Sequence, residues 1–269
     1  MLSSVPAVAA AKADTKPLSN PDLRSGAFYI YDESDSKVLA ARNEGVAVPI
    51  ASITKLMTAL VVLEAGQPMD AKIAMTRDDA KHTAGSVSRL APGARLSRAD
   101  LLHLALMSSE NRAAYALCRT YPGGTAACVS AMNRKAKSLG MKSARFVEPT
   151  GLSSANVSSP ADLARLVRAA AANPTIREYS TDPEHTVHVK GQALEYRSTN
   201  SLVKKPDWQV TVQKTGYIAD AGRCLVMEAV IDGRDVVIVL LNSWGKLTRI
   251  GDANRVRSWL AANTPPKAG

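Results

Sequence analysis

Three short motifs in this chain of 269 residues combine residue types that can transfer an acyl group. Ser52 is followed three positions later by Lys55, Ser109 is followed by Asn111 after one intervening residue, and a single Lys-Thr-Gly triplet begins at Lys214. A serine hydroxyl becomes a nucleophile when a neighbouring base takes its proton, and an amine whose pKa is lowered can be that base. The three motifs therefore predict an acyl-transfer site with a serine nucleophile and a lysine base.

The serine–lysine spacing is weakly informative by itself, because a chain of this length contains about one such pair by chance. This chain contains four. The three other pairs are Ser34 with Lys37, Ser201 with Lys204, and Ser243 with Lys246. The Ser-x-Asn spacing also recurs, so local structure has to decide which copies could work.

Local structure favours the pair formed by Ser52 and Lys55. Side chains three positions apart are neighbours on a helix but point to opposite faces of a strand. An almost unbroken apolar run at 56–63 follows this pair and stops at Gly66 and Pro68, as a buried helix would. The other pairs lie in a polar turn, before a Lys-Lys-Pro-Asp loop, and in a strand-to-helix connection. We therefore place the favoured pair in the first turn of a buried helix, where unpaired N–H groups stabilise negative charge.

The other two motifs fall at the ends of expected elements. A helix that ends at Met107 and another that begins at Arg112 leave Ser109 and Asn111 at a break between helices. The Lys-Thr-Gly triplet closes an expected strand, where its glycine allows a peptide to approach and pair with the backbone. A hairpin is expected at 27–41, strands near 185–190, 194–198, 208–214, 223–231 and 234–241, and a closing helix at about 247–261.

Longer phrases surround the motifs. They are Pro49-Ile-Ala-Ser-Ile-Thr-Lys-Leu-Met-Thr58, Met107-Ser-Ser-Glu-Asn-Arg-Ala-Ala114, Glu148-Pro-Thr-Gly-Leu-Ser153, Lys214-Thr-Gly-Tyr217 and Ala221-Gly-Arg-Cys-Leu-Val-Met227. With these phrases, the chain resembles a low-molecular-mass penicillin-binding protein of the D-alanyl-D-alanine endopeptidase type, a serine DD-peptidase. The resemblance spans roughly residues 22–262, and the separations of 57 and 105 residues between motif starts suit that family.

The resemblance implies an α/β fold of the β-lactamase and transpeptidase type. We expect a five-stranded antiparallel sheet with helices on both faces, and a helical block that forms the other wall of the site. One catalytic domain at 22–262 is expected between an N-terminal tail or signal-peptide remnant at 1–21 and a loose C-terminal end at 263–269.

The resemblance also implies catalytic roles. Ser52 would attack the carbonyl of a D-Ala residue and hold the acyl group. Lys55 would be the general base, with a pKa lowered by burial and by the nearby charge of Lys214. Ser109 would relay a proton to the leaving amine, and Asn111 would orient the lysine and hold the substrate amide.

The third motif is expected to bind the substrate. Lys214, Thr215 and Gly216 would take its carboxylate end, and the backbone N–H groups of Ser52 and Tyr217 would form an oxyanion hole. The implied function is hydrolysis of D-Ala-linked cross-bridges of peptidoglycan through an acyl-enzyme that penicillins also acylate, as part of cell wall biogenesis and the maintenance of cell shape.

Alternatives to this function remain open. A D-alanyl-D-alanine carboxypeptidase that trims stem pentapeptides breaks the same bond, and a catalytically silent cell-wall binding module could keep the fold. The intact Ser52, Lys55 and Lys214 disfavour the silent module. Glu110 stands where the β-lactamase pattern has aspartate, and Glu148 lies in a setting that does not match the β-lactamase loop for deacylation. We therefore expect slowly reversed inhibition by β-lactams rather than their efficient hydrolysis.

Composition bounds the partners. The formal net charge is +10, but the basic residues are scattered and are not interleaved with aromatic residues, so no nucleic-acid partner is expected and an acidic partner is favoured. His185 and His188 would face opposite ways on a strand, so we expect no metal, and no cofactor is expected either.

The tail, the hydropathy and the cysteines indicate a secreted protein. Residues 5–11 resemble the end of a secretory signal, and no stretch approaches the roughly 18 apolar residues of a membrane helix. We expect a soluble periplasmic protein with at most peripheral membrane association. A disulfide between Cys118 and Cys128 is a hypothesis, and Cys224 is expected to be a buried free thiol.

Overall fold

A five-stranded antiparallel sheet organises the protein, which is described by a computed structural model over residues 21–263. The strand order is β2-β1-β11-β10-β9. The strands are β1 (Ala27–Asp32), β2 (Lys37–Arg42), β9 (Gln209–Ile218), β10 (Gly222–Ile231) and β11 (Arg234–Ser243). The sequence-based expectations for the two chain ends fall outside the described residues, apart from residues 21 and 263.

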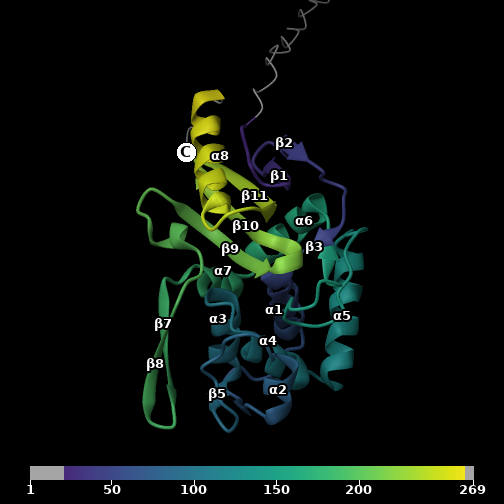
Figure 1. The fold of residues 1–269 in the computed structure, drawn as a ribbon, viewed down its shortest axis with the longest axis vertical. Helices are drawn as coiled ribbons and strands as arrows, with labels where there is room; N and C mark the ends of the chain where they lie inside the picture. The colour runs from purple at the N-terminus through teal and green to yellow at the C-terminus, as the bar shows by residue number, and fades with distance from the viewer. Residues whose placement is uncertain (1–20, 264–269) are drawn as a thin grey trace, which may run out of the picture.

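The two faces of the sheet pack against different helices, because alternate residues of a strand point to opposite faces. In β11, Val237 and Val239 belong to the core shared with the helical block, whereas Ile238 and Leu240 belong to a second core under α8 (Thr248–Asn263). Figure 1 shows α8 in yellow beside the sheet and most other helices below it. The predicted sheet with helices on both faces is confirmed.

The helical block is built around α1 (Thr54–Glu64), which is buried from Thr54 to Val62. Its nearly continuous apolar sequence explains this position, since such a helix can be covered on every side. The other helices are α2 (Arg77–His82), α3 (Arg98–Met107), α4 (Asn111–Arg119), α5 (Gly124–Ser138), α6 (Pro160–Ala171) and α7 (Pro174–Thr181). As predicted, α3 and α4 are interrupted at the second motif.

Three small two-stranded sheets complete the fold. They pair β3 (Val48–Pro49) with β6 (Val157–Ser158), β4 (Lys72–Ala74) with β5 (Arg95–Ser97), and β7 (Glu184–Val189) with β8 (Gln192–Arg197). The first of these pairs brings the chain just after residue 150 beside the segment that leads into α1.

Two expected boundaries were wrong. The Lys-Thr-Gly triplet does not close its strand, because β9 continues to Ile218 and Gly216 pairs with Cys224 of β10. The turn begins only at the short 3₁₀ helix η3 (Ala219–Ala221), so the ladder holds the glycine inside the strand. Ser201 was expected directly before a loop and outside any helix, but it begins the 3₁₀ helix η2 (Ser201–Lys204).

The cysteines match the hypothesis. Cys118 of α4 and Cys128 of α5 form a disulfide with their Cα atoms 5.4 Å apart, which fits the usual spacing. The turn that it closes contains Gly123 at φ 85°, in the left-handed region that glycine adopts readily. Cys224 is a buried free thiol. Within residues 21–263, no helix is long and apolar enough to cross a membrane.

Candidate active site

Ser52 lies in a one-turn 3₁₀ helix, η1 (Ala51–Ile53), that leads directly into α1. It was expected in the first turn of the α-helix itself, so the structure moves it one turn earlier. Ala51 has a φ of 47°, a strained value for a residue with a side chain. The Thr54 hydroxyl donates to the Ala51 carbonyl at 2.8 Å and secures this bend. Such strain, stabilised by its surroundings, is typical of a functional turn.

Lys55 is the centre of the hydrogen-bond network. Its Nζ lies 2.7 Å from Ser52 Oγ, 2.7 Å from Asn111 Oδ1 and 2.6 Å from the carbonyl oxygen of Thr150, and the residue is only 1% exposed. A neutral amine has two N–H donors and one lone pair. When its two donors bind Asn111 and Thr150, the lone pair faces the Ser52 hydroxyl. The arrangement can therefore remove the proton of Ser52, and it brings the first two motifs together as predicted.

The pKa of Lys55 suits a base near neutral pH. Burial lowers this pKa to about 7, and the negative charges of Glu148 and Glu110 oppose the shift. The lowered pKa was predicted, but the charge of Lys214 is not among its causes. Burial instead lowers the pKa of Lys214 itself, and the charges of Lys55 and Arg249 lower it further.

Glu148 braces the carbonyl that Lys55 contacts. Its carboxylate accepts hydrogen bonds from the Thr150 N–H and hydroxyl, both at 2.6 Å, from the Gly151 N–H at 2.6 Å and from Asn156 Nδ2 at 2.8 Å. Asn156 Nδ2 also lies 3.1 Å from the hydroxyl of Thr54, next to η1. The loop is thereby tied to the nucleophile turn. The Glu-Pro-Thr-Gly phrase marked this segment in the sequence without revealing the bracing.

Gly151 allows this loop to approach the nucleophile turn. Its φ is +84°, and a Cβ atom placed on it would lie 1.9 Å from the Ala51 carbonyl oxygen. No side chain fits at that distance. Glycine is therefore required for the contact that carries Thr150 to Lys55.

The break between α3 and α4 presents the second motif. Ser109 is half-buried with a φ of 63°, another strained backbone position, and it lies two residues before Asn111. Glu110 caps α4, because its carboxylate accepts from the Arg112 N–H at 3.1 Å. The glutamate at the position of the β-lactamase aspartate thus shapes the turn, while the Asn111 side chain reaches Lys55.

Strand β9 presses against the nucleophile turn at Gly216. A Cβ atom on this glycine would lie 3.0 Å from the Ile50 carbonyl oxygen and 3.1 Å from Ser52 N. The backbone at Gly216, next to Tyr217, therefore runs beside the Ser52 N–H. An oxyanion hole formed by the N–H groups of Ser52 and Tyr217 requires this proximity. The third predicted motif is thus brought to the first.

The side chains of the third motif are buried. Lys214 is fully buried and its Nζ donates to the Thr215 carbonyl oxygen at 2.9 Å. The Thr215 hydroxyl lies 2.5 Å from that of Thr199, whose N–H donates to the Met107 carbonyl at 3.2 Å. The strand is in this way linked to the end of α3.

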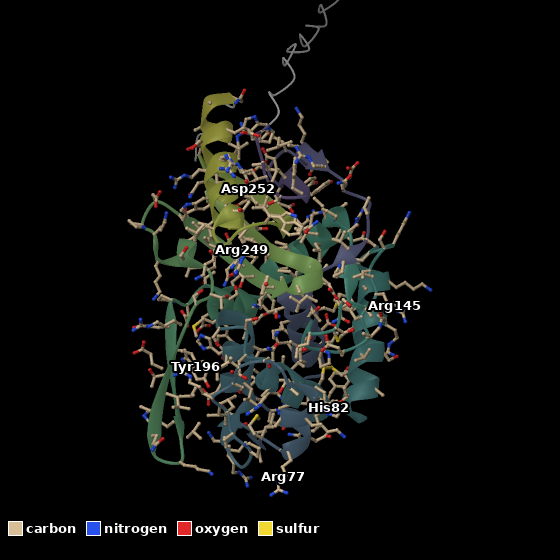
Figure 2. The ribbon with its side chains drawn as sticks, in the orientation of Figure 1. Arg77, His82, Arg145, Tyr196, Arg249 and Asp252 are labelled. Carbon is tan, nitrogen blue, oxygen red and sulfur yellow. A yellow bond between two sulfur atoms is a disulfide. The ribbon has the colours of Figure 1, made fainter. Side chains whose placement is uncertain are left out.

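Arg249, in the first turn of α8, was missed by the sequence reasoning. Its Nε and Nη1 are buried and have no hydrogen-bond partner among the described residues. Burial and then the charge of Arg223 lower the pKa of Arg249. Among residues 21–263, no acidic side chain is a cause of the pKa shift of Lys214, so an anionic ligand group would supply the counter-charge that favours the charged forms of Lys214 and Arg249. Figure 2 labels Arg249 at the end of α8 that meets the sheet.

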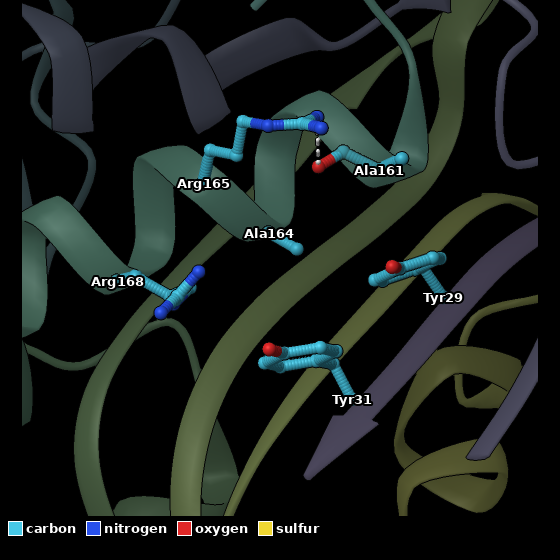
Figure 3. Close-up of a pocket in the computed structure, with 6 residues that line it drawn as sticks. All are labelled: Tyr29, Tyr31, Ala161, Ala164, Arg165 and Arg168. Atoms are coloured by element: carbon cyan, nitrogen blue, oxygen red, sulfur yellow. Dashed lines mark hydrogen bonds between the residues drawn. The ribbon is translucent and has the colours of Figure 1, made fainter. Parts of the chain in front are cut away.

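A separate hollow between β1 and α6 contains none of the predicted site residues. It is lined by Tyr29, Tyr31, Ala161, Ala164, Arg165 and Arg168, and Figure 3 shows the two tyrosine rings opposite the helix. Its arginines already form ion pairs with Asp162 and Glu33. In the described part of the chain, no group of three or more histidine, cysteine or acidic side chains could hold a metal ion.

Known proteins resemble this chain in sequence and in fold. The model of the peptidase S11 family, described as D-alanyl-D-alanine carboxypeptidase, matches residues 13–245. A D-alanyl-D-alanine endopeptidase of Pseudomonas aeruginosa is 46% identical over 241 residues, covering 89% of this chain and 78% of the relative. One of Escherichia coli is 44% identical over 257 residues, covering 95% and 83%. The structure of the Streptomyces K15 DD-transpeptidase superposes with a TM-score of 0.84 at 25% identity, over 91% of this chain and all of that one.

Proposed function

Because this chain belongs to the peptidase S11 family of serine DD-peptidases, we propose that it hydrolyses D-Ala-linked cross-bridges of peptidoglycan through an acyl-enzyme on Ser52. One observation carries the proposal. The amine of Lys55 has two fixed hydrogen-bond acceptors, Asn111 Oδ1 and the Thr150 carbonyl, and keeps its third direction for Ser52 Oγ at 2.7 Å.

The acylation step uses this arrangement. Lys55 Nζ takes the proton of Ser52 while Oγ bonds to the carbonyl carbon of the substrate D-Ala. The oxyanion that forms accepts from the N–H groups of Ser52 and Tyr217. The C–N bond then breaks, and the proton on Lys55 passes through the Ser109 hydroxyl to the leaving amine.

Deacylation reverses these proton transfers. Lys55 takes a proton from a water molecule as the water oxygen attacks the ester carbonyl. The ester bond to Ser52 Oγ breaks, and Oγ takes the proton back. An amine with a pKa of about 7 is half neutral near physiological pH, so it can accept and return a proton with little cost.

The remaining site residues hold the substrate. Lys214, Thr215 and Arg249 meet the carboxylate on the leaving side of the scissile bond, because this carboxylate is the counter-charge that the two buried basic groups lack among residues 21–263, and Thr215 adds a hydroxyl. Gly216 leaves the β9 backbone open for an extended peptide to approach. Asn111 contacts Lys55 and also holds the substrate amide.

The cross-link is favoured as substrate over the stem pentapeptide. The two relatives at 46% and 44% identity are both named endopeptidases, whereas a carboxypeptidase of Mycobacterium tuberculosis is 31% identical. Both activities break the same kind of bond, so carboxypeptidase action is the alternative. Peptidoglycan lies outside the cytoplasmic membrane, so the proposal places the protein in the periplasm. β-Lactams, which carry a strained amide and a carboxylate, are expected to acylate the same serine.

Paired digestions test this proposal. Purified cross-linked muropeptide dimers and monomeric pentapeptides are incubated with the protein, and the products are separated by chromatography. We expect dimers to disappear faster than pentapeptides lose D-Ala, and Ser52→Ala to abolish the cleavage. Pentapeptide trimming with intact dimers would establish the carboxypeptidase instead, and dimer cleavage by Ser52→Ala would contradict the acyl-enzyme.

A further inference from the structure

A hollow of about 240 Å³ opens beside Tyr217, and Tyr217 is the only residue in its lining to which the proposed mechanism assigns a role. Three segments form it: the end of β9 with η3, the start of β10, and the end of β11 with the loop that leads to α8. We call it the Tyr217–Trp244 hollow. It is lined by Tyr217, Ala219, Gly222, Arg223, Asn242, Ser243, Trp244, Gly245 and Lys246.

The hollow gathers the exposed aromatic surface of the protein. Trp244 is 81% exposed and Tyr217 is 57% exposed, and no other phenylalanine, tryptophan or tyrosine among residues 21–263 is exposed. Leu247, next to the lining residues, is 73% exposed. Large apolar side chains that share one exposed surface mark a binding site, since leaving them in water gains nothing for the fold.

The hollow is also positively charged. The Arg223 guanidinium lies over the Tyr217 ring, 4.5 Å from its centroid, and Lys246 is exposed on the opposite loop. No lining residue is acidic. A cationic pocket with flat aromatic walls fits a ligand that is elongated and negatively charged.

The course of β9 connects the hollow to Ser52. A substrate whose leaving-side carboxylate meets Lys214, and whose reacting carbonyl points to the Tyr217 N–H, extends along the strand toward Ala219. Successive residues of an extended peptide advance by about 3.3 Å, so the one or two residues before the scissile D-Ala reach the hollow. These residues belong to the acyl side of the substrate.

We propose that the Tyr217–Trp244 hollow binds the acyl-side stem peptide of the cross-linked substrate, an acidic peptide whose free carboxylates meet Arg223 and Lys246 while its aliphatic parts pack on Trp244. The proposal rests on the proposed function and extends it, because it names the part of the substrate that is recognised away from the scissile bond. Short acyl donors such as penicillin do not reach Trp244.

Binding of the acidic stem tetrapeptide, the acyl-side product, measures this subsite without requiring turnover. Isothermal titration calorimetry compares the wild type with Trp244→Ala, Lys246→Ala and the matched control Val87→Ala, which removes a 93% exposed side chain outside the hollow. We expect the first two variants to weaken binding about five- to tenfold and the control to leave it unchanged. The Lys246→Ala effect should shrink at high salt. Equal dissociation constants for all four proteins would overturn the proposal.

Kinetics separate this subsite from the proposed function. Trp244→Ala should raise KM for cross-linked dimers about tenfold, while its acylation rate by a fluorescent penicillin stays within about twofold of the wild type. Equal losses with dimers and penicillin would mean general damage to the site and would contradict the subsite. A wild type that binds the tetrapeptide yet never cuts dimers would instead defeat the endopeptidase assignment and leave the subsite supported.

Discussion

Strand β9 runs past both the Ser52 site and the Tyr217–Trp244 hollow, but the polar groups of these two regions are satisfied in different ways. Around Ser52, buried groups bind one another: Lys55 contacts Asn111 and Thr150, and Glu148 holds the Thr150 loop. In the hollow, Tyr217, Trp244 and Lys246 are exposed, Arg223 is half-buried, and no acidic residue lines the wall. The protein thus fixes its own chemical groups in advance and leaves the recognition surface for the substrate to complete.

This difference separates the expected effects of substitutions. A change at the Ser52 site should slow acylation by every substrate, including penicillin, because the reacting groups lose their geometry. A change in the hollow should affect only substrates long enough to reach it.

Lys55→Ala should reduce the rate of penicillin acylation about 10³-fold near neutral pH, because Ser52 loses its general base. Stopped-flow or gel-based labelling measures this rate, and circular dichroism checks the fold. Lys204→Ala is the matched control, since it removes a lysine from another serine–lysine pair. Undiminished acylation in Lys55→Ala would contradict the assigned base.

Arg249→Ala should lower kcat/KM for cross-linked dimers about 10- to 100-fold, because a charge-assisted contact to the leaving-side carboxylate is lost. A substrate whose carboxylate is converted to a neutral amide should lose the same factor with the wild type and little more with the variant. Independent, additive losses would show that Arg249 does not meet that carboxylate.

Glu148→Gln should shift the pH dependence of acylation. The base must be neutral, so the wild-type rate should rise with pH through about 7, the pKa of Lys55, and level off above it. Removing the negative charge of Glu148, which raises this pKa, should move the midpoint to lower pH. The plateau should fall about tenfold, since an amide cannot accept all the donors that the carboxylate accepts.

The control for that experiment is Glu64→Gln, which neutralises a carboxylate paired with Lys135 at the other end of α1. Its midpoint should match the wild type. If Glu148→Gln also keeps the wild-type midpoint, its carboxylate does not tune Lys55.

Replacement of Cys118 and Cys128 by serine should have the smallest effect on acylation. The bridge joins α4 to α5 across a short segment, so its loss should lower the free energy of unfolding by about 2–4 kcal/mol. Urea unfolding measures this change. Acylation of the folded variant should stay within about twofold, and a loss comparable to that of Lys55→Ala would show that the bridge positions the reacting groups.

The sequence predicted the parts of this molecule that depend on local pattern. The apolar run after Ser52 selected one of four serine–lysine pairs, local patterns located the strands, and the family resemblance implied the five-stranded sheet. The expected helix end at Met107 and helix start at Arg112 placed Asn111 at a break between helices. The roles of Glu148 and Arg249 were missed because they depend on segments far apart in the chain. Glu148 holds its own loop, but that loop matters because Thr150 contacts Lys55 and Asn156 contacts Thr54. Arg249 acts on Lys214 from another element, and its buried Nε and Nη1 have no hydrogen-bond partner among residues 21–263. No local pattern reports such contacts.

The one-turn shift of Ser52 has a similar origin. The 3₁₀ turn η1 lies against β9 at Gly216 and against the Glu148 loop at Gly151, so its conformation depends on tertiary contacts. Those glycines were visible in the sequence, but what they approach was not. The extension of β9 beyond the Lys-Thr-Gly triplet likewise depends on its pairing with β10.

Mapping the covalent adduct of penicillin by mass spectrometry of the digested protein tests directly whether Ser52 is the nucleophile. We predict one penicilloyl group per molecule, on the peptide that contains Ser52, and no adduct in Ser52→Ala. An adduct on Ser201 or Ser243, or equal labelling of Ser52→Ala, would contradict the assignment of the nucleophile.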